Sequence, residues 1–126
     1  MVVLVVEDEP GITDFLRRGF EAAGFAVVVE ADGHQGLLSA QREDIDLMVL
    51  DLGLPDIDGL EVLRRAREQG VQVPVIVVTA STGGDDRAQA RALGVDDYLV
   101  KPFPMNQLLA SLDRLDPGLK EAAVSS

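Results

Sequence analysis

Short apolar segments recur along the chain, and longer stretches of mixed character separate them. The segments at residues 2–6 and 47–50 read VVLVV and LMVL, with no alternation of apolar and polar positions. A continuously apolar run of this length is typical of a strand buried on both faces, as parallel strands usually are. The predicted strands cover residues 2–6, 25–29, 47–51, 73–78 and 97–100.

The stretches between these segments carry apolar residues at helical spacing. Asp32 and Asp58 have the position of N-cap residues, and Gly24, Gly70 and Gly94 stand where helices would end. The predicted helices cover residues 12–23, a segment after Asp32 that includes Leu37, Leu38 and Ala40, the segment between Asp58 and Gly70, and residues 85–93 and 105–115. Alternating strands and helices predict an α/β fold, in which right-handed crossovers join parallel strands into a doubly wound sheet with helices on both faces.

Each predicted helix has an apolar stripe that should face the sheet. In the first helix the stripe includes Phe15 and Phe20, and in the second it includes Leu37 and Leu38. Leu108, Leu109 and Leu112 form the stripe of the last helix, where a place in the core is expected rather than a partner-binding role.

The length of 126 residues predicts one domain with one hydrophobic core. Its expected extent is residues 1–115, because Asp116-Pro117-Gly118 interrupts the last helix. Residues 116–126 are expected to be a tail or the start of a linker, and both a single-domain protein and a part of a longer one fit this pattern.

Composition narrows the classes of function. The net charge of −11 argues against direct binding to nucleic acid, which needs clustered Lys and Arg. Cysteine is absent, and no apolar run approaches the ~20 residues of a membrane helix. A soluble protein of the cytoplasm, without contact to a membrane, is therefore expected.

Polar residues follow four of the predicted strands. Glu7 and Asp8 come after the first strand, Asp51 ends the third, Thr79 follows the fourth and Lys101 follows the fifth. The carboxyl ends of parallel strands meet at one edge of the sheet, where ligands of α/β proteins bind. Three carboxylates at this edge would raise a pKa or bind a cation, and hard oxygen ligands suit Mg²⁺ or Mn²⁺. With a Lys and a hydroxyl group, they could hold a phosphoryl group.

Five motifs in order resemble the receiver domain of two-component response regulators. They are Val5-Val6-Glu7-Asp8-Glu9, Asp51 with Leu54-Pro55, Asp58-Gly59, Thr79-Ala80, and Asp97-Tyr98-Leu99-Val100-Lys101-Pro102-Phe103. The resemblance covers residues 2–115. It implies a flavodoxin-like (βα)5 fold with strand order 2-1-3-4-5.

The resemblance also implies a role for each site residue. Asp51 would accept a phosphoryl group from a sensor histidine kinase or a histidine phosphotransfer protein. Glu7, Asp8, Asp51 and the main-chain carbonyl of Gly53 would hold Mg²⁺, with Mn²⁺ as an alternative. Lys101, joined to Pro102 by a cis peptide bond, would pair with Asp51 and then with a phosphoryl oxygen, while Thr79 and the N–H of Ala80 would bind the other oxygens.

Phosphorylation would act on a partner-binding face through Thr79 and Tyr98. Thr79 would move toward the phosphoryl group and Tyr98 would turn inward, which reshapes the face of the fourth helix, fifth strand and fifth helix. The partner on this face is an unknown output domain or effector protein. A phosphorylation-dependent homodimer stays open: Arg87 and Asp97 match the charge pattern of winged-helix regulators, and two other positions, Gln107 and Ser111, depart from it.

Two other functions share part of this residue set. A magnesium-dependent phosphohydrolase normally has a second Asp two residues after its nucleophile, where this chain has Gly53. The prediction is therefore a signalling domain that assists only its own phosphorylation and dephosphorylation, not a turnover enzyme. A receiver-like domain that binds without phosphorylation is disfavoured by the intact set of acids, Thr79 and Lys101.

Several charged residues are expected to have only surface roles. Solvated positions are predicted for His34, the single histidine of the chain, and for Arg64, Arg65 and Arg67. Glu9 is ranked below Glu7 and Asp8 as a metal ligand.

Overall fold

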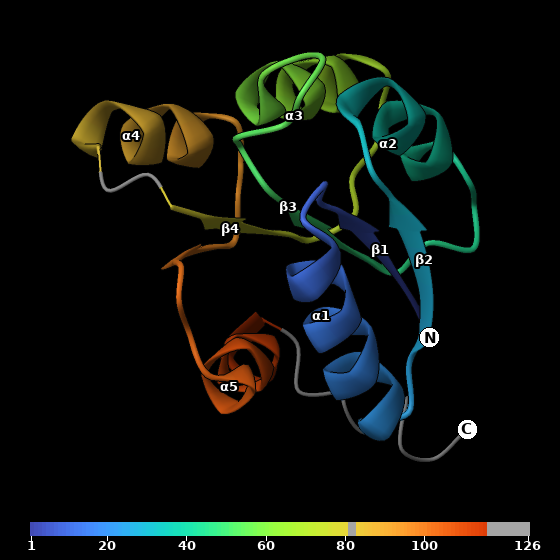
Figure 1. Cartoon of the computed structure of the whole chain (residues 1–126). Coiled ribbons are helices and arrows are strands. Elements are labelled where there is room, and N and C mark those ends of the chain that lie inside the picture. Colours follow the sequence, from blue (N-terminus) through green and yellow to red (C-terminus); the bar gives the residue numbers. More distant parts are fainter. Residues whose placement is uncertain (81–82, 116–126) are drawn as a thin grey trace.

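The computed structural model describes residues 1–80 and 83–115. Within these residues a single five-stranded parallel sheet has the order β2-β1-β3-β4-β5 (Figure 1). This confirms the predicted fold and strand order. The strands are β1 (Val2–Val6), β2 (Ala26–Glu30), β3 (Leu47–Leu50), β4 (Val75–Thr79) and β5 (Asp97–Val100).

Helices cover both faces of the sheet. The described residues form α1 (Pro10–Ala22), α2 (Gly33–Ala40), α3 (Gly59–Glu68), α4 (Gly84–Ala92) and α5 (Met105–Leu115). α1 and α5 lie on one face, and α2, α3 and α4 lie on the other (Figure 1). The expected doubly wound arrangement is therefore present.

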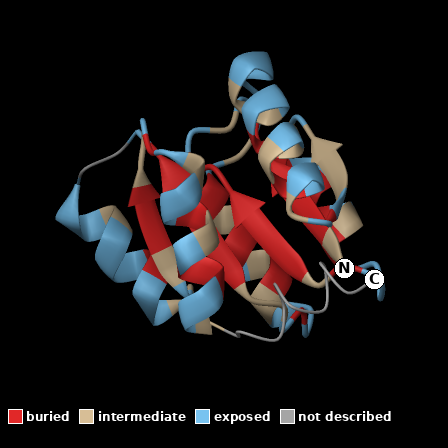
Figure 2. Cartoon of the chain, turned by 90° about the horizontal axis from the view of Figure 1, so that it is seen from below, coloured by how far each residue is buried: buried red, intermediate tan, exposed pale blue. Residues whose placement is uncertain are grey.

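The sheet separates two apolar clusters, and neighbouring residues of one strand belong to different clusters. In β1, Val3 and Val5 pack with α1 and α5, whereas Leu4 and Val6 pack with α2 and α3. All five residues of β4 are buried, which places this strand deep in the core (Figure 2). Burial on both faces explains why the apolar runs show no alternation.

The bounds of three predicted strands are displaced by one or two residues. β2 covers Ala26–Glu30 rather than 25–29, and β3 ends at Leu50 rather than at Asp51. β4 begins at Val75 rather than Val73. Pro74 has no N–H to donate to a neighbouring strand, although its carbonyl accepts a bond of 2.9 Å from the N–H of Met48. The apolar run therefore starts before the regular ladder does.

Two apolar residues that were predicted to face the core are exposed instead. Leu38 is 61% exposed and Phe15 is 38% exposed. The buried positions of α2 are Gly33, Gly36, Leu37 and Ala40, so that Leu38, one residue beyond Leu37, turns away from the sheet. Phe15 keeps an edge-to-face contact with Phe103, with 6.1 Å between the ring centroids.

The predicted helix ends are present. Asp32 accepts a hydrogen bond from the N–H of Gln35, and Asp58 accepts one from Leu60. The three glycines predicted as stops, at 24, 70 and 94, have φ values of 94°, 85° and 81°. The predicted tail or linker, residues 116–126, lies outside the described residues. Among the described helices, none has the length and apolar character needed to cross a membrane.

Candidate functional site

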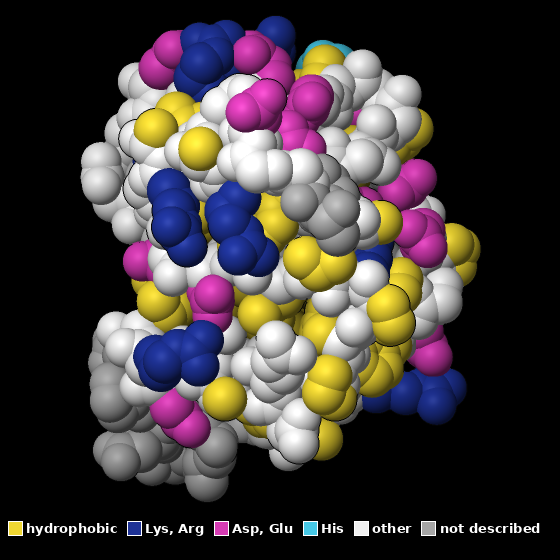
Figure 3. Space-filling model, turned by 90° about the vertical axis from the view of Figure 1, so that its left-hand side faces the viewer, with side chains coloured by type: hydrophobic (Ala, Val, Ile, Leu, Met, Phe, Trp, Pro, Cys, Tyr) yellow, Lys and Arg dark blue, Asp and Glu magenta, His cyan; other side chains and the backbone are white. Residues whose placement is uncertain are grey.

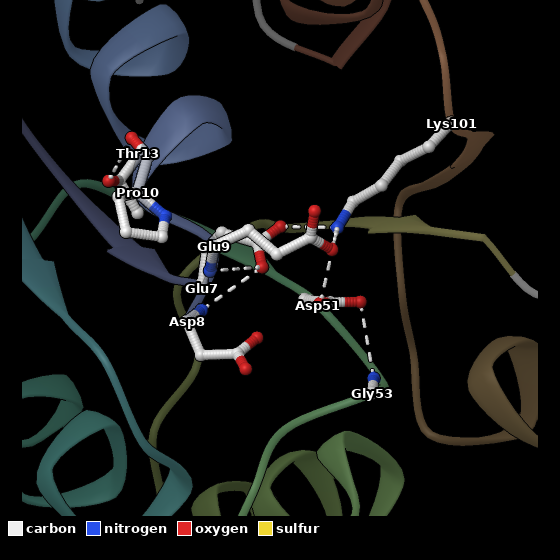
Figure 4. Close-up of polar contacts among 8 residues, drawn as sticks. All are labelled: Glu7, Asp8, Glu9, Pro10, Thr13, Asp51, Gly53 and Lys101. Atoms are coloured by element: carbon white, nitrogen blue, oxygen red, sulfur yellow. Dashed lines mark hydrogen bonds and ion pairs between the residues drawn. The ribbon is translucent and has the colours of Figure 1, made fainter.

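The carboxyl ends of the strands bring the predicted site residues together. Val6 of β1 pairs with Leu50 of β3, so Glu7 and Asp51 leave the sheet side by side. One carboxylate oxygen from each of Glu7, Asp8 and Asp51 lies within 4.8 Å of the others. Glu7 and Asp51 are buried and Asp8 is exposed. The result is an acidic cluster with one side open to solvent (Figure 4).

Lys101 reaches into this cluster from the end of β5. Its Nζ atom lies 2.5 Å from Oε1 of Glu7, 3.2 Å from Oε1 of Glu9 and 3.3 Å from Oδ2 of Asp51 (Figure 4). Burial acts to lower the pKa of Lys101, but the hydrogen bond to Glu7 and the charge of Asp51 hold this pKa above its ordinary value. The Lys101 side chain is therefore a buried cation among carboxylates.

Backbone contacts fix the point from which Lys101 enters. The N–H of Lys101 donates a 2.8 Å bond to the carbonyl of Thr79, at the end of the adjacent strand. The peptide bond between Lys101 and Pro102 is cis.

Glu7 has the most perturbed carboxyl group of the cluster. Burial raises the pKa of Glu7 to about 7; the hydrogen bond from Lys101 opposes this rise, and the neighbouring Asp51 adds to it. Its Oε2 atom accepts bonds from the N–H groups of Asp8 (3.0 Å) and Glu9 (3.3 Å). Its buried Oε1 atom faces the ammonium group of Lys101, which is its one partner among the described residues. This oxygen therefore already lies against a cation.

The loop after β3 wraps closely around Asp51. Oδ1 of Asp51 accepts a 3.1 Å bond from the N–H of Gly53. Gly59 lies against the backbone of Asp51, because a Cβ at Gly59 would be only 2.3 Å from the carbonyl oxygen of Asp51. α3 thus begins directly beside the residue predicted to be phosphorylated.

A cleft lies above Asp51. Its lining includes Gly53, Thr79, Ala80 and Lys101, all of which the sequence had singled out. Glu9, Asp58 and Asp86 also line it. Asp58 and Asp86 were not predicted at the site: Asp58 was expected to be a helix cap and a motif residue without a role in the cleft, and Asp86 lies in a helix with no strand end to mark it.

The comparison with known families decides the identity of this arrangement. The model of the response regulator receiver domain matches residues 3–113. The chain belongs to this family. Its strand order and the acids at its strand ends are those expected of a receiver domain, and its role is in phosphorylation-dependent signalling.

Curated relatives of this receiver domain are transcriptional regulators. The chain is 46% identical over 110 residues to the KDP operon transcriptional regulatory protein KdpE of Escherichia coli, covering 87% of this chain and 48% of the relative. It is 40% identical over 110 residues to the transcriptional regulatory protein TrcR of Mycobacterium tuberculosis, covering 87% of this chain and 43% of the relative. The chain therefore spans about half the length of these curated relatives or less.

Solved receiver domains share the fold. A CheY-like receiver domain protein of Methanospirillum hungatei has a TM-score of 0.86 at 29% identity, covering 95% of this chain and 97% of that chain. The receiver domain of the sensor histidine kinase PA1611 of Pseudomonas aeruginosa has a TM-score of 0.78 at 36% identity, covering 90% of this chain and 94% of that chain. The latter structure has a magnesium ion coordinated in its active-site cleft.

Tyr98 of the receiver domain lies beneath an arginine of α4. It is buried in β5, where it pairs with Val77 of β4. The guanidinium group of Arg87 lies 4.9 Å from the centre of the Tyr98 ring, a cation–π contact. The ring is thus enclosed between the sheet and α4.

The adjacent Asp97 is engaged within the chain. Its Oδ2 atom contacts Ser111 and lies 2.5 Å from a guanidinium nitrogen of Arg114. Burial acts to raise the pKa of Asp97, but the bonds from Ser111, the N–H of Tyr98 and Arg114 hold it below its ordinary value. Asp97, which matched the charge pattern of a homodimer, therefore already pairs with Arg114 of α5 in the same chain.

The prediction that Arg67 is a solvated residue is wrong. Arg67 donates bonds of 2.9 to 3.1 Å to the carbonyls of Val71, Val73, Leu93 and Gly94, which joins α3 to the loops before β4 and β5. Four carbonyls that converge from two loops leave no signal in a helical pattern. Arg64 and Arg65 do lie at the surface, where they pair with Glu61.

His34 is half-exposed but has a partner. Its Nδ1 atom lies 2.5 Å from Oδ2 of Asp56, a residue of the loop between β3 and α3. The predicted surface location is correct, and the contact with a distant loop was not foreseen. Glu9 contacts Lys101 and is not one of the three clustered acids, in agreement with its lower rank.

Proposed function

We propose that Asp51 is the phosphoacceptor of this receiver domain. The observation that carries the proposal is the buried Asp51 carboxylate, which lies at the base of the cleft with Lys101 3.3 Å away and Thr79 and Ala80 in the lining. A carboxylate oxygen of Asp51 attacks the phosphorus atom of a phosphohistidine. The P–N bond breaks as the P–O bond forms, and the departing imidazole nitrogen keeps the electron pair and takes up a proton.

Mg²⁺ is the cation that the acidic cluster fits best. Glu7, Asp8 and Asp51 offer hard oxygen ligands, and the buried Oε1 of Glu7 already faces a cation, the Lys101 ammonium group. We assign these three residues and the main-chain carbonyl of Gly53 as the groups that hold the ion; Mn²⁺ would take the same oxygens. When bound, the ion offsets the negative charge that gathers on the phosphoryl oxygens.

Lys101, Thr79 and the N–H of Ala80 bind the remaining phosphoryl oxygens in this proposal. The Lys101 ammonium group already lies between Glu7 and Asp51, so a phosphoryl group on Asp51 adds an anion within its reach. Thr79 ends the neighbouring strand β4 and lines the cleft. The Lys101 ammonium group lies close to Asp51 before the reaction, which favours electrostatic stabilisation of the added charge.

The phosphorylated state then acts through Tyr98. Withdrawal of Thr79 toward the phosphoryl group frees space beside β4, and the Tyr98 ring turns further inward. This movement changes the contact with Arg87 and therefore the surface formed by α4, β5 and α5, on the side of the molecule where Lys and Arg side chains gather (Figure 3). The charge added at Asp51 would thus shift this surface from one conformation to another.

The proposed phosphorylation requires a phosphoryl donor and a partner that responds to the phosphorylated state. The phosphoryl donor is a sensor histidine kinase or a histidine phosphotransfer protein of the cytoplasm. The receiver of the signal is an output domain or effector on the α4–β5–α5 surface, since the net charge of −11 does not favour nucleic acid. The chain is a signalling domain and not a turnover enzyme, because Gly53 stands where an acid–base carboxylate would be needed.

Intact-mass measurement tests this function. The native chain, incubated with Mg²⁺ and acetyl phosphate, should gain the mass of one phosphoryl group, and Asp51→Ala should gain none. Asp44→Ala, which removes an exposed acid far from the cluster, should be phosphorylated as the native chain is. An unchanged adduct on Asp51→Ala, or repeated hydrolysis of small phosphomonoesters by the native chain, would contradict the proposal.

A further inference from the structure

A loop next to the phosphorylation site is attached to the start of α2. Asp56 lies in the loop between β3 and α3. Its Oδ1 atom accepts a 2.7 Å bond from the N–H of Gly33, and its Oδ2 atom accepts a 2.9 Å bond from the N–H of His34. The ring of His34 adds a third contact, at 2.5 Å from Oδ2. A single carboxylate thus joins two segments that are more than 20 residues apart.

Asp56 caps N–H groups at the start of α2 that the N-cap residue of this helix does not bind. Asp32, the N-cap, accepts a 2.8 Å bond from the N–H of Gln35. The N–H groups of Gly33 and His34 precede that bond and have no acceptor within the helix. The positive end of the helix dipole also favours an anion at this position. Asp56 therefore satisfies donors that would otherwise be unpaired.

Side-chain packing also brings the loop close to the start of α2. A Cβ at Gly33 would lie 2.5 Å from Cγ1 of Ile57 and 2.9 Å from Cγ2 of Val62. Any side chain at Gly33 would push the loop away from α2. The two segments touch because residue 33 is glycine.

The loop of residues 52–58 is thereby held at both of its ends. Near Asp51, the N–H of Gly53 donates to Oδ1 of Asp51, and the N–H of Gly59 donates a 3.0 Å bond to the carbonyl of Leu52. Farther along, Asp56 anchors the loop to α2. Without Asp56, this part of the loop would lose its hydrogen bonds to α2 and keep only the apolar packing of Ile57 there.

We propose that Asp56 is a positioning residue of the phosphorylation site, which holds the 52–58 loop so that the carbonyl of Gly53 faces the acidic cluster before a cation arrives. This inference rests on the proposed role of Gly53 in the metal site. Residues that orient metal ligands from outside the ligand set typically change metal affinity about 10–100-fold when they are removed. Asp56 acts through one backbone carbonyl, so an effect near the lower end, about tenfold, is expected.

The test measures binding of Mg²⁺ alone. Isothermal titration calorimetry on folded protein should show about tenfold weaker affinity for Asp56→Ala and a smaller loss for Asp56→Asn, whose amide oxygen can still accept one N–H. Hydrogen exchange of metal-free protein should be faster in residues 52–57 of both variants. The matched control is Asp32→Ala, which also removes a cap from α2 but leaves the loop attached, and it should lower stability while keeping the native Mg²⁺ affinity.

The outcomes separate this inference from the proposed function. If the native chain binds Mg²⁺ and is phosphorylated, and both Asp56 variants bind Mg²⁺ with native affinity, the positioning role is wrong. It is also wrong if Asp32→Ala weakens Mg²⁺ binding as much as Asp56→Ala does, because the effect is then one of helix stability. If the native chain itself neither binds Mg²⁺ nor takes up a phosphoryl group, the proposed function fails first. Should Asp56→Ala not fold, Asp56→Asn decides the question.

Discussion

Lys101 and Glu7 form a buried ion pair, with 2.5 Å between Nζ and Oε1. The resemblance had assigned Lys101 to Asp51, but the ammonium group lies 0.8 Å closer to Glu7, since its distance to Oδ2 of Asp51 is 3.3 Å. In the absence of a metal ion, Lys101 is the cation that offsets the two buried acids. The electrostatic state of the site therefore depends on three groups together.

The first prediction concerns the dependence of stability on pH without metal. The pKa of Glu7 is raised to about 7 by burial, against an ordinary value near 4.5. The folded chain therefore binds more protons than the unfolded chain between these values, and stability should fall as pH rises from about 4.5 to 7. Urea unfolding in EDTA at a series of pH values measures this fall.

Glu7→Gln is the variant that isolates this contribution. It should lose part of the pH dependence, by an amount on the order of 1–2 kcal/mol, since the group is coupled to its neighbours. A native curve that rises over this interval, or a Glu7→Gln curve parallel to the native one, would show that Glu7 keeps an ordinary pKa.

The second prediction is that Asp51→Asn stabilises the metal-free chain. Asp51 lies beside Glu7 and raises its pKa, so both carboxylates cannot be ionised without repulsion. Removing one charge should increase the free energy of unfolding in EDTA by about 1 kcal/mol, as is common where function requires a strained site. Asp44→Asn, at an exposed pair with Arg42, is the control and should leave the stability nearly unchanged. Equal stability of Asp51→Asn and the native chain would remove the argument for repulsion.

The third prediction is that Gly59→Ala disturbs Asp51. The added Cβ would lie 2.3 Å from the carbonyl oxygen of Asp51 and 2.6 Å from Cα of Leu52, so the backbone itself has to move. Overpacking of this kind costs about 1–3 kcal/mol, and the extent of phosphorylation by acetyl phosphate should fall with it. Gly11→Ala meets no atom within 4 Å and should keep both properties. Native phosphorylation of Gly59→Ala would show that the start of α3 can shift without moving Asp51.

The fourth prediction concerns the bonds of Arg67. Arg67→Ala leaves the carbonyls of Val71, Val73, Leu93 and Gly94 without their donor and should cost about 2–4 kcal/mol. Hydrogen exchange should become faster in the loops before β4 and β5. Arg64→Ala, on the exposed side of the same helix, should leave the stability nearly unchanged. The bonds would be unimportant if the two variants had the same midpoint in urea.

The fifth prediction separates phosphorylation from its consequence. Thr79→Ala should still be phosphorylated on Asp51, because its hydroxyl group is not the nucleophile, but it should lose the movement of Tyr98. Tyr98 is the single tyrosine and the chain has no tryptophan, so tyrosine fluorescence reports its surroundings directly. Beryllofluoride with Mg²⁺ should change this fluorescence in the native chain and leave it nearly constant in Thr79→Ala.

Arg87→Ala serves as the control for this measurement. Loss of the cation 4.9 Å from the ring should change the starting fluorescence but not abolish the response to beryllofluoride. A full response in Thr79→Ala would mean that Thr79 does not couple the site to Tyr98.

Local pattern was sufficient for most of the fold. Asp32, Asp58 and the three glycine stops were read correctly because caps and left-handed turns depend on neighbouring residues alone. Leu38 was misplaced because Gly33 and Gly36, which have no apolar side chain to mark them, form the buried side of α2. A glycine at a close contact has no signature in a hydrophobic pattern.

The candidate site was predictable only where strand ends mark it. Glu7, Asp51 and Lys101 were placed together because parallel strands end at one edge. Asp56 and Arg67 bind backbone groups that are distant in the sequence, and no residue spacing predicts such contacts. The preference of Lys101 for Glu7 also required coordinates, since strand order gives neighbours but not distances.

The internal pairing of Asp97 has a consequence for recognition. Its carboxylate already has the guanidinium group of Arg114 at 2.5 Å. An arginine of a partner protein could bind Asp97 only by displacing Arg114. Because Arg114 belongs to the same chain, its effective concentration at Asp97 is in the millimolar range or above. Selectivity on this surface should then come from the shape of α4 and α5 and from contacts made by uncharged side chains, and charge exchange at position 97 would be a poor way to retarget the domain.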